Sequence, residues 1–162
     1  MVKILFVCTA NRCRSPMAER LFKRILAARG LSEADWQVTS AGTWTEDGIP
    51  PDENLVAAMA TFEIDVRDHR SRMLDAAIIA EQDLVLVMEN HHKEALCFEF
   101  PTQSERVFLI SEMIGKQFEI DDPFSGPLKA YQRTAEELDR ILNEGFERMI
   151  AESSKLKGER KE

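Results

Sequence analysis

A short segment near the start of the chain combines a thiol, a guanidinium and a hydroxyl group at close spacing. It reads Cys-Thr-Ala-Asn-Arg-Cys-Arg-Ser over residues 8–15, so Arg14 lies six positions after Cys8 and Ser15 follows it directly. A thiolate is a strong nucleophile, and a guanidinium offers a planar fork of N–H groups to the oxygens of a phosphoryl group. The pattern therefore indicates phosphoryl chemistry with Cys8 as the nucleophile.

The flanking elements are expected to hold this segment as an anion-binding loop. Residues 3–8 form an apolar, β-branched and aromatic run typical of a strand, and residues 17–29 carry apolar residues at helical spacing. Ser15 and Pro16 suit the cap and the first position of that helix. In a strand–loop–helix unit, the N–H groups of the loop curl around one point at the helix N-terminus, where an anion and a thiolate are both favoured.

The rest of the chain alternates short apolar runs with helical patterns. We expect further strands at 36–41, 83–88 and 106–111, and helices at 52–62, 74–80, 90–98, 112–118 and from about 128 to the low 150s. Strands that are apolar on both faces and alternate with helices are typical of parallel sheets. The predicted fold is α/β: a single-domain, doubly wound sandwich with a central four-stranded parallel sheet and helices on both faces. We expect the domain to span residues 1–152 and residues 153–162 to form a frayed tail.

Composition excludes several classes of partner. The chain has 162 residues with 21 basic and 29 acidic side chains, a formal net charge of −8, which argues against binding of nucleic acid. Its longest apolar run, residues 55–60, is far shorter than the roughly 20 residues that cross a bilayer, and the apolar start has no cleavage site, so we expect neither membrane insertion nor a signal peptide. Three cysteines are too few for a disulfide framework, which favours the cytoplasm.

The segment 8–15 resembles the phosphate-binding loop of the low-molecular-weight protein tyrosine phosphatases, which follows one N-terminal strand and reads cysteine, five residues, arginine, serine. Four later segments are similar to further motifs of that family and follow in the same order: Ser40–Thr43, Asp68–Arg72, Asp83–Met88 and Asp122–Phe124. The resemblance covers nearly the whole chain. It implies a protein tyrosine phosphatase that works through a cysteinyl-phosphate intermediate, with no metal and no other cofactor.

The resemblance also implies catalytic roles for individual residues. Cys8 would attack phosphorus, Arg14 would stabilise charge on the phosphoryl oxygens, and Ser15 would donate a hydrogen bond to the sulfur. Asp122 would protonate the leaving oxygen and then activate water. Asp121 competes for this role, and we choose Asp122 on the family pattern.

The remaining loop residues are assigned to phosphate binding and to support of the loop. Asn11 is expected in a left-handed conformation that asparagine tolerates well, tied to Ser40 and His69 behind the loop. The phosphate would be bound by Thr9, Ala10, Asn11, Arg12, Cys13, Arg14 and Ser15.

Two positions depart from the commonest loop of the family, which has glycine at the position of Ala10 and isoleucine or threonine at that of Arg12. In relatives, isoleucine there accompanies phosphotyrosine activity and threonine accompanies phosphoarginine activity. A guanidinium at the rim would repel the guanidinium of phosphoarginine and attract an aromatic ring, which favours phosphotyrosine, unless Arg12 points into solvent. Trp44 and Phe124 are expected to line the same aryl-accepting rim, with a place in the core as the alternative for each.

The other cysteines and the paired histidines have competing interpretations. Cys13 either packs under the loop or forms a reversible disulfide with Cys8 that protects the nucleophile from over-oxidation. Cys97 is expected to be buried in a helix. His91 and His92 are adjacent and are not expected to share a helix face, which argues against a metal site there.

Four alternative functions remain open. A protein arginine phosphatase would share all catalytic residues, and the segment 122–126 lacks the paired tyrosines of many tyrosine-specific relatives. An arsenate reductase would need further cysteines, of which only Cys97 lies outside the loop. A phosphocarrier similar to the IIB component of sugar phosphotransferase systems, or a silent anion-binding module, would not need Asp122. The expected partners are a phosphorylated protein substrate and its cognate tyrosine kinase; the sequence selects no oligomeric state.

Overall fold

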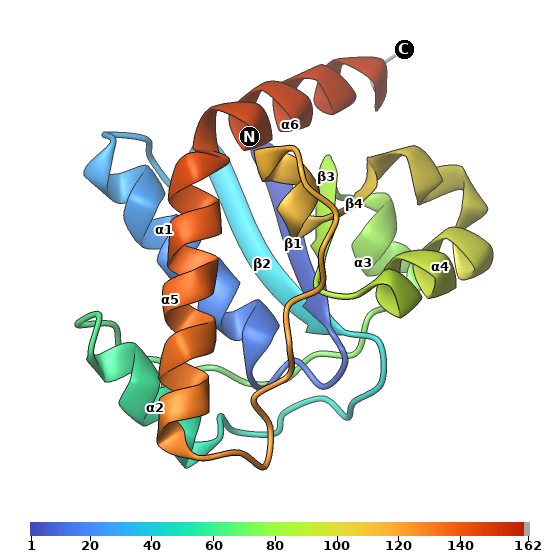
Figure 1. Ribbon diagram of the computed structural model, residues 1–162. Helices are drawn as coiled ribbons and strands as arrows, with labels where there is room; N and C mark the ends of the chain where they lie inside the picture. Colours follow the sequence, from blue (N-terminus) through green and yellow to red (C-terminus); the bar gives the residue numbers. More distant parts are fainter. Residues whose placement is uncertain (161–162) are drawn as a thin grey trace.

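A four-stranded parallel sheet forms the centre of the molecule, which is a computed structural model that describes residues 1–160. The strands are β1 (Val2–Cys8), β2 (Trp36–Gly42), β3 (Leu84–Val87) and β4 (Val107–Leu109), in the order β2-β1-β3-β4 (Figure 1). In β1, residues 4–8 are all buried, because neighbouring side chains point to opposite faces and both faces are covered. The predicted parallel sheet is confirmed.

Helices cover both faces of this sheet, which confirms the doubly wound sandwich. The helices α1 (Arg14–Ala28), α2 (Glu53–Ala60) and α5 (Leu128–Glu144) lie on one side, and α3 (Ala76–Ala80) and α4 (Asn90–Glu99) on the other (Figure 1). Two cores result: Phe6 of β1 packs against Phe22 of α1 in one, whereas Leu5 belongs to the other core together with Leu96 of α4. The strand periodicity thus divides the apolar residues between two layers.

The C-terminal region differs from the expectation of one helix and a frayed tail. Helix α5 ends at Glu144 and is followed by Gly145, where a Cβ would lie 2.9 Å from that of Met113. Helix α6 (Phe146–Arg160) then crosses the end of the sheet at which β1 begins (Figure 1). The expectation of a frayed tail was wrong for residues 153–160, which are helical, and residues 161–162 lie outside the described part. Leu156 is buried in the core and Arg160 pairs with buried Asp83 at 3.1 Å, so packing extends past the expected boundary at residue 152.

Two further expectations were wrong in detail. The predicted helix 112–118 is instead a short 3₁₀ helix, η2 (Ile110–Ile114), after which an irregular segment leads to α5; a second 3₁₀ helix, η1 (Pro101–Arg106), precedes β4. Helix α1 begins at Arg14 with Cys13 as its N-cap, so Ser15 lies inside the first turn and its hydroxyl group does not cap the helix. That hydroxyl group instead accepts a hydrogen bond from Asn11 within the loop.

The strand order places the loops after β1 and β3 at the same edge of the sheet. Connections leave β1 and β3 in opposite directions, which opens a crevice outside the carboxyl ends of these two strands. The loop 8–15 follows β1, and Glu89 follows closely after β3. Within residues 1–160, no helix is long and apolar enough to span a bilayer.

Candidate active site

The loop between β1 and α1 turns its N–H groups away from all protein acceptors. Within residues 1–160, no backbone N–H group of residues 9–15 donates a hydrogen bond to the protein. The loop carbonyl groups, in contrast, are bonded outward: Cys8 accepts from the N–H group of Thr43 at 3.0 Å and Thr9 from that of Trp44 at 2.9 Å. Successive free N–H groups at a helix N-terminus form a cradle suited to a tetrahedral oxyanion.

The Cys8 sulfur lies at the start of this cradle. It is 3.0 Å from Oγ of Ser15, and the same oxygen accepts a hydrogen bond of 2.9 Å from Nδ2 of Asn11. A thiolate at Cys8 can only accept, so the hydroxyl proton of Ser15 then points at the sulfur. This arrangement places Ser15 where it can stabilise negative charge on sulfur.

Asn11 organises the loop from behind, with the left-handed conformation expected for it (φ 55°). Its Nδ2 also donates to Oγ of Ser40 at 2.9 Å, and its carbonyl oxygen lies 2.7 Å from Nε2 of His69. Burial lowers the pKa of His69, and a carbonyl only accepts, so the neutral ring carries its proton on Nε2. Ser40 in turn donates to the buried Glu19 at 2.5 Å, a residue that the sequence analysis did not single out.

Gly42, at the end of β2, allows this edge of the sheet to approach the loop. A Cβ atom at Gly42 would lie 2.6 Å from the carbonyl oxygen of Thr9, closer than any side chain tolerates. Glycine is therefore needed here for close backbone approach, although its own φ is not left-handed.

Arg14 is 1% exposed and is held by three groups from other parts of the chain. Its Nη1 donates to the carbonyl oxygen of Ile120 at 2.8 Å and lies 2.9 Å from Oε2 of Glu89, while its Nη2 lies 3.5 Å from Oδ2 of Asp122. Partial burial opposes ionisation of Glu89, but the hydrogen bond and charge of Arg14 outweigh it and lower the pKa of this carboxyl group. Within the described residues, Nε of Arg14 has no hydrogen-bond partner.

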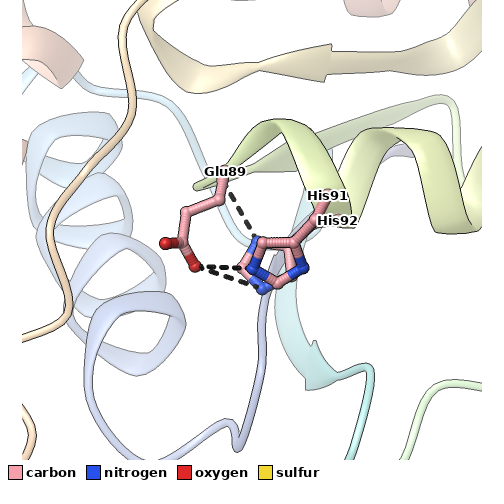
Figure 2. A group of neighbouring side chains, drawn as sticks. All are labelled: Glu89, His91 and His92. Atoms are coloured by element: carbon pink, nitrogen blue, oxygen red, sulfur yellow. Dashed lines mark hydrogen bonds and ion pairs between the residues drawn. The ribbon is translucent and has the colours of Figure 1, made fainter.

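Glu89 also contacts the two adjacent histidines, His91 and His92, at the start of α4 (Figure 2). Nε2 of His91 lies 3.0 Å from Oε2 of Glu89, and the two imidazole rings are 4.1 Å apart between centroids. The expectation that neighbouring histidines would point apart was thus wrong, because their rotamers bring both rings to one carboxylate. Ligand atoms of Glu89, His91 and His92 lie within 4.8 Å of one another, which is suitable spacing for a metal ion.

The hydrogen bonds of His92, however, indicate that it supports the loop of residues 8–15. Its Nδ1 accepts the N–H group of Glu89 at 3.1 Å, so in the neutral ring Nε2 carries the proton and donates to Oγ1 of Thr9 at 2.8 Å. Burial, with repulsion from His91 and Arg14, lowers the pKa of His92 to about 4 and keeps the ring neutral. Because both nitrogens are bonded and Glu89 is paired with Arg14, this cluster supports the loop and offers a metal no free ligand set.

A cavity of about 200 Å³ lies inside the loop and contains most of the predicted residues. It is lined by Cys8, Thr9, Ala10, Arg12, Cys13, Arg14, Asp122 and Phe124. Asn11, Ser15, Ser40 and His69 do not line it and support the loop from behind. Asp121 lines a different hollow, beside Glu137.

Trp44 does not share this cavity with Phe124, contrary to the expected common rim. Its side chain is 80% exposed and lines a neighbouring hollow. Arg12 lies between the two, lines both, and donates from Nε to the carbonyl oxygen of Pro50 at 3.3 Å. The Arg12 side chain is therefore held at the mouth by this hydrogen bond.

The three cysteines are free thiols in different surroundings. Cys13 is 5% exposed, and burial, partly offset by a hydrogen bond to Tyr131, raises the pKa of its thiol to about 12. Cys97 is only partly buried and packs at the edge of the core, which corrects the expectation of burial.

Comparison with known proteins agrees with this geometry. A family model described as "Low molecular weight phosphotyrosine protein phosphatase" matches residues 3–155. Among similar proteins are a "Probable low molecular weight protein-tyrosine-phosphatase EpsP" from Ralstonia nicotianae (37% identical, 93% of this chain and 99% of the relative) and a "Protein-arginine-phosphatase" from Bacillus subtilis (35%, 87% and 92%). The crystal structure of a low-molecular-weight protein tyrosine phosphatase from T. tengcongensis superposes with a TM-score of 0.85 at 36% identity, covering 91% of this chain and 99% of the other.

Proposed function

The chain belongs to the low-molecular-weight phosphotyrosine protein phosphatase family, and from that premise we propose that it hydrolyses phosphotyrosine in proteins through a phosphocysteine at Cys8. One observation carries the proposal: the Cys8 sulfur lies on a cavity lined by its own loop and by the buried Arg14. Within residues 1–160, the N–H groups of loop residues 9–15 have no protein acceptor and Nε of Arg14 has no hydrogen-bond partner. Buried donors without acceptors are costly, and the oxygens of a phosphoryl group would satisfy them.

In the first step, the Cys8 thiolate attacks phosphorus opposite the leaving oxygen. The S–P bond forms as the P–O bond breaks, while Arg14 and the loop N–H groups stabilise charge on the three equatorial oxygens. Asp122, on the cavity wall and 3.5 Å from Arg14, gives its proton to the leaving oxygen. The products of this step are the dephosphorylated side chain and phosphocysteine.

In the second step, water replaces sulfur on phosphorus. Asp122, now a carboxylate, takes a proton from the attacking water, and the S–P bond breaks to release inorganic phosphate. The Ser15 hydroxyl group, 3.0 Å from the sulfur, donates to the thiolate that forms. No step requires a metal or another cofactor.

The rim of the cavity supports an aryl phosphate as the substrate. Phe124 lines the cavity with 57% of its surface exposed, so its ring can contact an incoming phenyl group. Arg12 places a positive charge at the mouth, where it would repel the guanidinium of phosphoarginine. Arginine dephosphorylation is the second candidate, since arginine phosphatases are among the similar proteins.

A side-by-side assay tests the choice of substrate. Initial rates are measured on phosphotyrosine and phosphoarginine peptides of matched sequence, with Cys8→Ser as the blank. We expect faster phosphotyrosine turnover and complete loss of both activities in the blank. A preference for phosphoarginine would refute the charge argument at Arg12 and favour the second candidate.

The same assay tests the alternatives that are not phosphatases. A phosphocarrier or an anion-binding module would show no multiple turnover of either peptide and no effect of Asp122→Asn. An arsenate reductase would need a third cysteine near the loop, and Cys97 on α4 packs in the other core layer.

We further propose a cytoplasmic location and a tyrosine kinase as the functional partner. Three free thiols, two of them in the cavity wall, suit a reducing compartment. The phosphorylated protein on which the phosphatase acts would be produced by the kinase whose action it reverses.

A further inference from the structure

A second hollow adjoins the catalytic cavity and has no part in the proposed chemistry. It has a volume of about 440 Å³ and is lined by Trp44, Ile49 and Met73, with Glu46 at its side. Ala10 and Arg12 belong to both hollows and form the ridge between them. A molecule bound in the catalytic cavity could therefore continue over Arg12 into the second hollow.

The walls of this hollow are fixed by hydrogen bonds. The Trp44 N–H group donates to the carbonyl oxygen of Thr9 at 2.9 Å, which joins one wall to the catalytic loop. The Met73 N–H group donates to Oδ1 of Asp47 at 2.7 Å, and the Ile49 N–H group to Oγ of Ser71 at 2.9 Å. The hollow is thus a defined part of the fold and shares its support with the nucleophile loop.

The apolar side chains of this hollow face solvent. Trp44 is 80% exposed and Met73 is 38% exposed, while Ile49 is partly buried. Exposed apolar side chains gathered in a hollow mark a binding site, and tryptophan is among the residues that contribute most to binding energy at interfaces. Arg12 and Glu46 are the charged residues of the lining, so its interior offers mainly apolar contact.

We propose that this hollow binds an apolar side chain of the substrate polypeptide, two residues away from the phosphorylated residue. In an extended chain, side chains at positions i and i+2 point to the same side and lie roughly 7 Å apart. The phosphorylated side chain enters the catalytic cavity, and the chain then crosses the Arg12 ridge to place the second side chain beside Trp44. This inference rests on the proposed function and adds a sequence preference to it.

Paired phosphotyrosine peptides test the proposal. Each carries leucine or serine two positions before or two positions after the phosphotyrosine, and kcat/KM is compared with that of a small aryl phosphate. We expect leucine on one of the two sides to raise kcat/KM by about tenfold, consistent with burial of one aliphatic side chain. Which side shows the effect gives the direction of the bound chain.

Two variants locate the preference in the hollow. In the wild type, kcat/KM for the leucine peptide should exceed that for the serine peptide by about tenfold. Trp44→Ala and Met73→Ala should each reduce this difference to about threefold or less. Met73→Ala should leave kcat/KM on the small aryl phosphate within about twofold, because its side chain does not line the catalytic cavity. Phe98→Ala, which removes an aromatic ring that is 90% exposed on α4, is the control and should change neither quantity.

The outcomes separate this inference from the proposed function. Equal kcat/KM for leucine and serine peptides, or a leucine preference that survives in both variants, would overturn the assignment of the hollow while the phosphatase activity stands. Absence of turnover on every peptide and on the aryl phosphate would instead overturn the proposed function, and this inference with it.

Discussion

The guanidinium group of Arg14 and the carboxylate of Glu89 lie 2.9 Å apart, at the edge of the sheet where β1 and β3 end. The two residues are far apart in sequence and meet because their strands are neighbours. Arg14 Nη1 is thereby held between Glu89 and the carbonyl oxygen of Ile120, and among residues 1–160 no acceptor binds its Nε. Glu89 therefore orients the guanidinium group for a phosphoryl oxygen.

Glu89→Gln tests this orientation. Glutamine removes the negative charge but keeps an oxygen that can accept from Arg14, so the fold should survive. We expect kcat to fall about tenfold, since charge-assisted hydrogen bonds are roughly twice as strong as neutral ones. KM should not rise, because the phosphoryl group binds the loop N–H groups and Nε of Arg14, and Glu89 contacts Nη1 instead. Glu81→Gln, which breaks an exposed ion pair with Lys3, is the control, and a loss of similar size there would contradict the assignment.

Separate substitution of the adjacent aspartates identifies the general acid. Both residues line the hollow beside Glu137, but only Asp122 of the two also lines the catalytic cavity. We expect Asp122→Asn to lower kcat on aryl phosphates by at least about a hundredfold, the usual scale of general acid catalysis, and Asp121→Asn to stay within about threefold of the wild type. Steady-state kinetics at matched pH would measure both. A larger loss in Asp121→Asn would reverse the assignment.

The buried His92 predicts a pH dependence of stability. Burial lowers its pKa to about 4 from the ordinary 6.5, so between these values the unfolded chain binds a proton that the folded chain does not. The stabilisation is therefore present above pH 6.5 and is lost as the pH falls towards 4, by on the order of 3 kcal/mol. Urea unfolding across this range would measure it. His92→Gln should flatten the dependence and the exposed His91→Gln should not; equal slopes in all three proteins would contradict the prediction.

Oxidation tests the protective role considered for Cys13. Peroxide would convert the Cys8 thiolate to a sulfenic acid, and the Cys13 sulfur would then form the S–S bond and expel water. We expect a Cys8–Cys13 link by mass spectrometry and recovery of activity with thiol reductant, both lost in Cys13→Ser but retained in Cys97→Ser. Because burial raises the pKa of Cys13 to about 12, the link should form faster as the pH is raised. Inactivation without a link and without recovery would exclude the role.

The close approach of Gly42 to the loop predicts that a larger residue at this position lowers both stability and activity. The Cβ atom of Gly42→Ala would lie 2.6 Å from the Thr9 carbonyl oxygen, so the loop must shift to admit it. We expect thermal unfolding at lower temperature, with a loss of a few kcal/mol, and a fall in kcat of more than about tenfold. Gly158→Ala is the matched control in α6 and should be neutral or slightly stabilising, because its new methyl group meets no atom of the described residues within 4 Å.

Local patterns in the sequence were sufficient for the fold class and for the centre of the site. The alternation of apolar strands and amphipathic helices determines a doubly wound sheet. The spacing of the apolar residues in each strand or helix places them on a face that must be buried. The loop between Cys8 and Arg14 is contiguous, so its position between a strand and a helix could be predicted without knowledge of distant contacts. The grouping of Asn11 with Ser40 and His69 followed from the family resemblance.

Only the tertiary structure decided the contacts that depend on strand order and on rotamers. Glu89 meets Arg14 because β3 lies beside β1, and the His91 and His92 rings meet at one carboxylate through side-chain torsions that sequence spacing does not specify. Likewise, Trp44 lines its own hollow beside the loop, to which its backbone is joined by one hydrogen bond to Thr9. The chain after residue 152 remains helical because Leu156 is buried in the core. This burial depends on packing against residues distant in sequence and not on local composition.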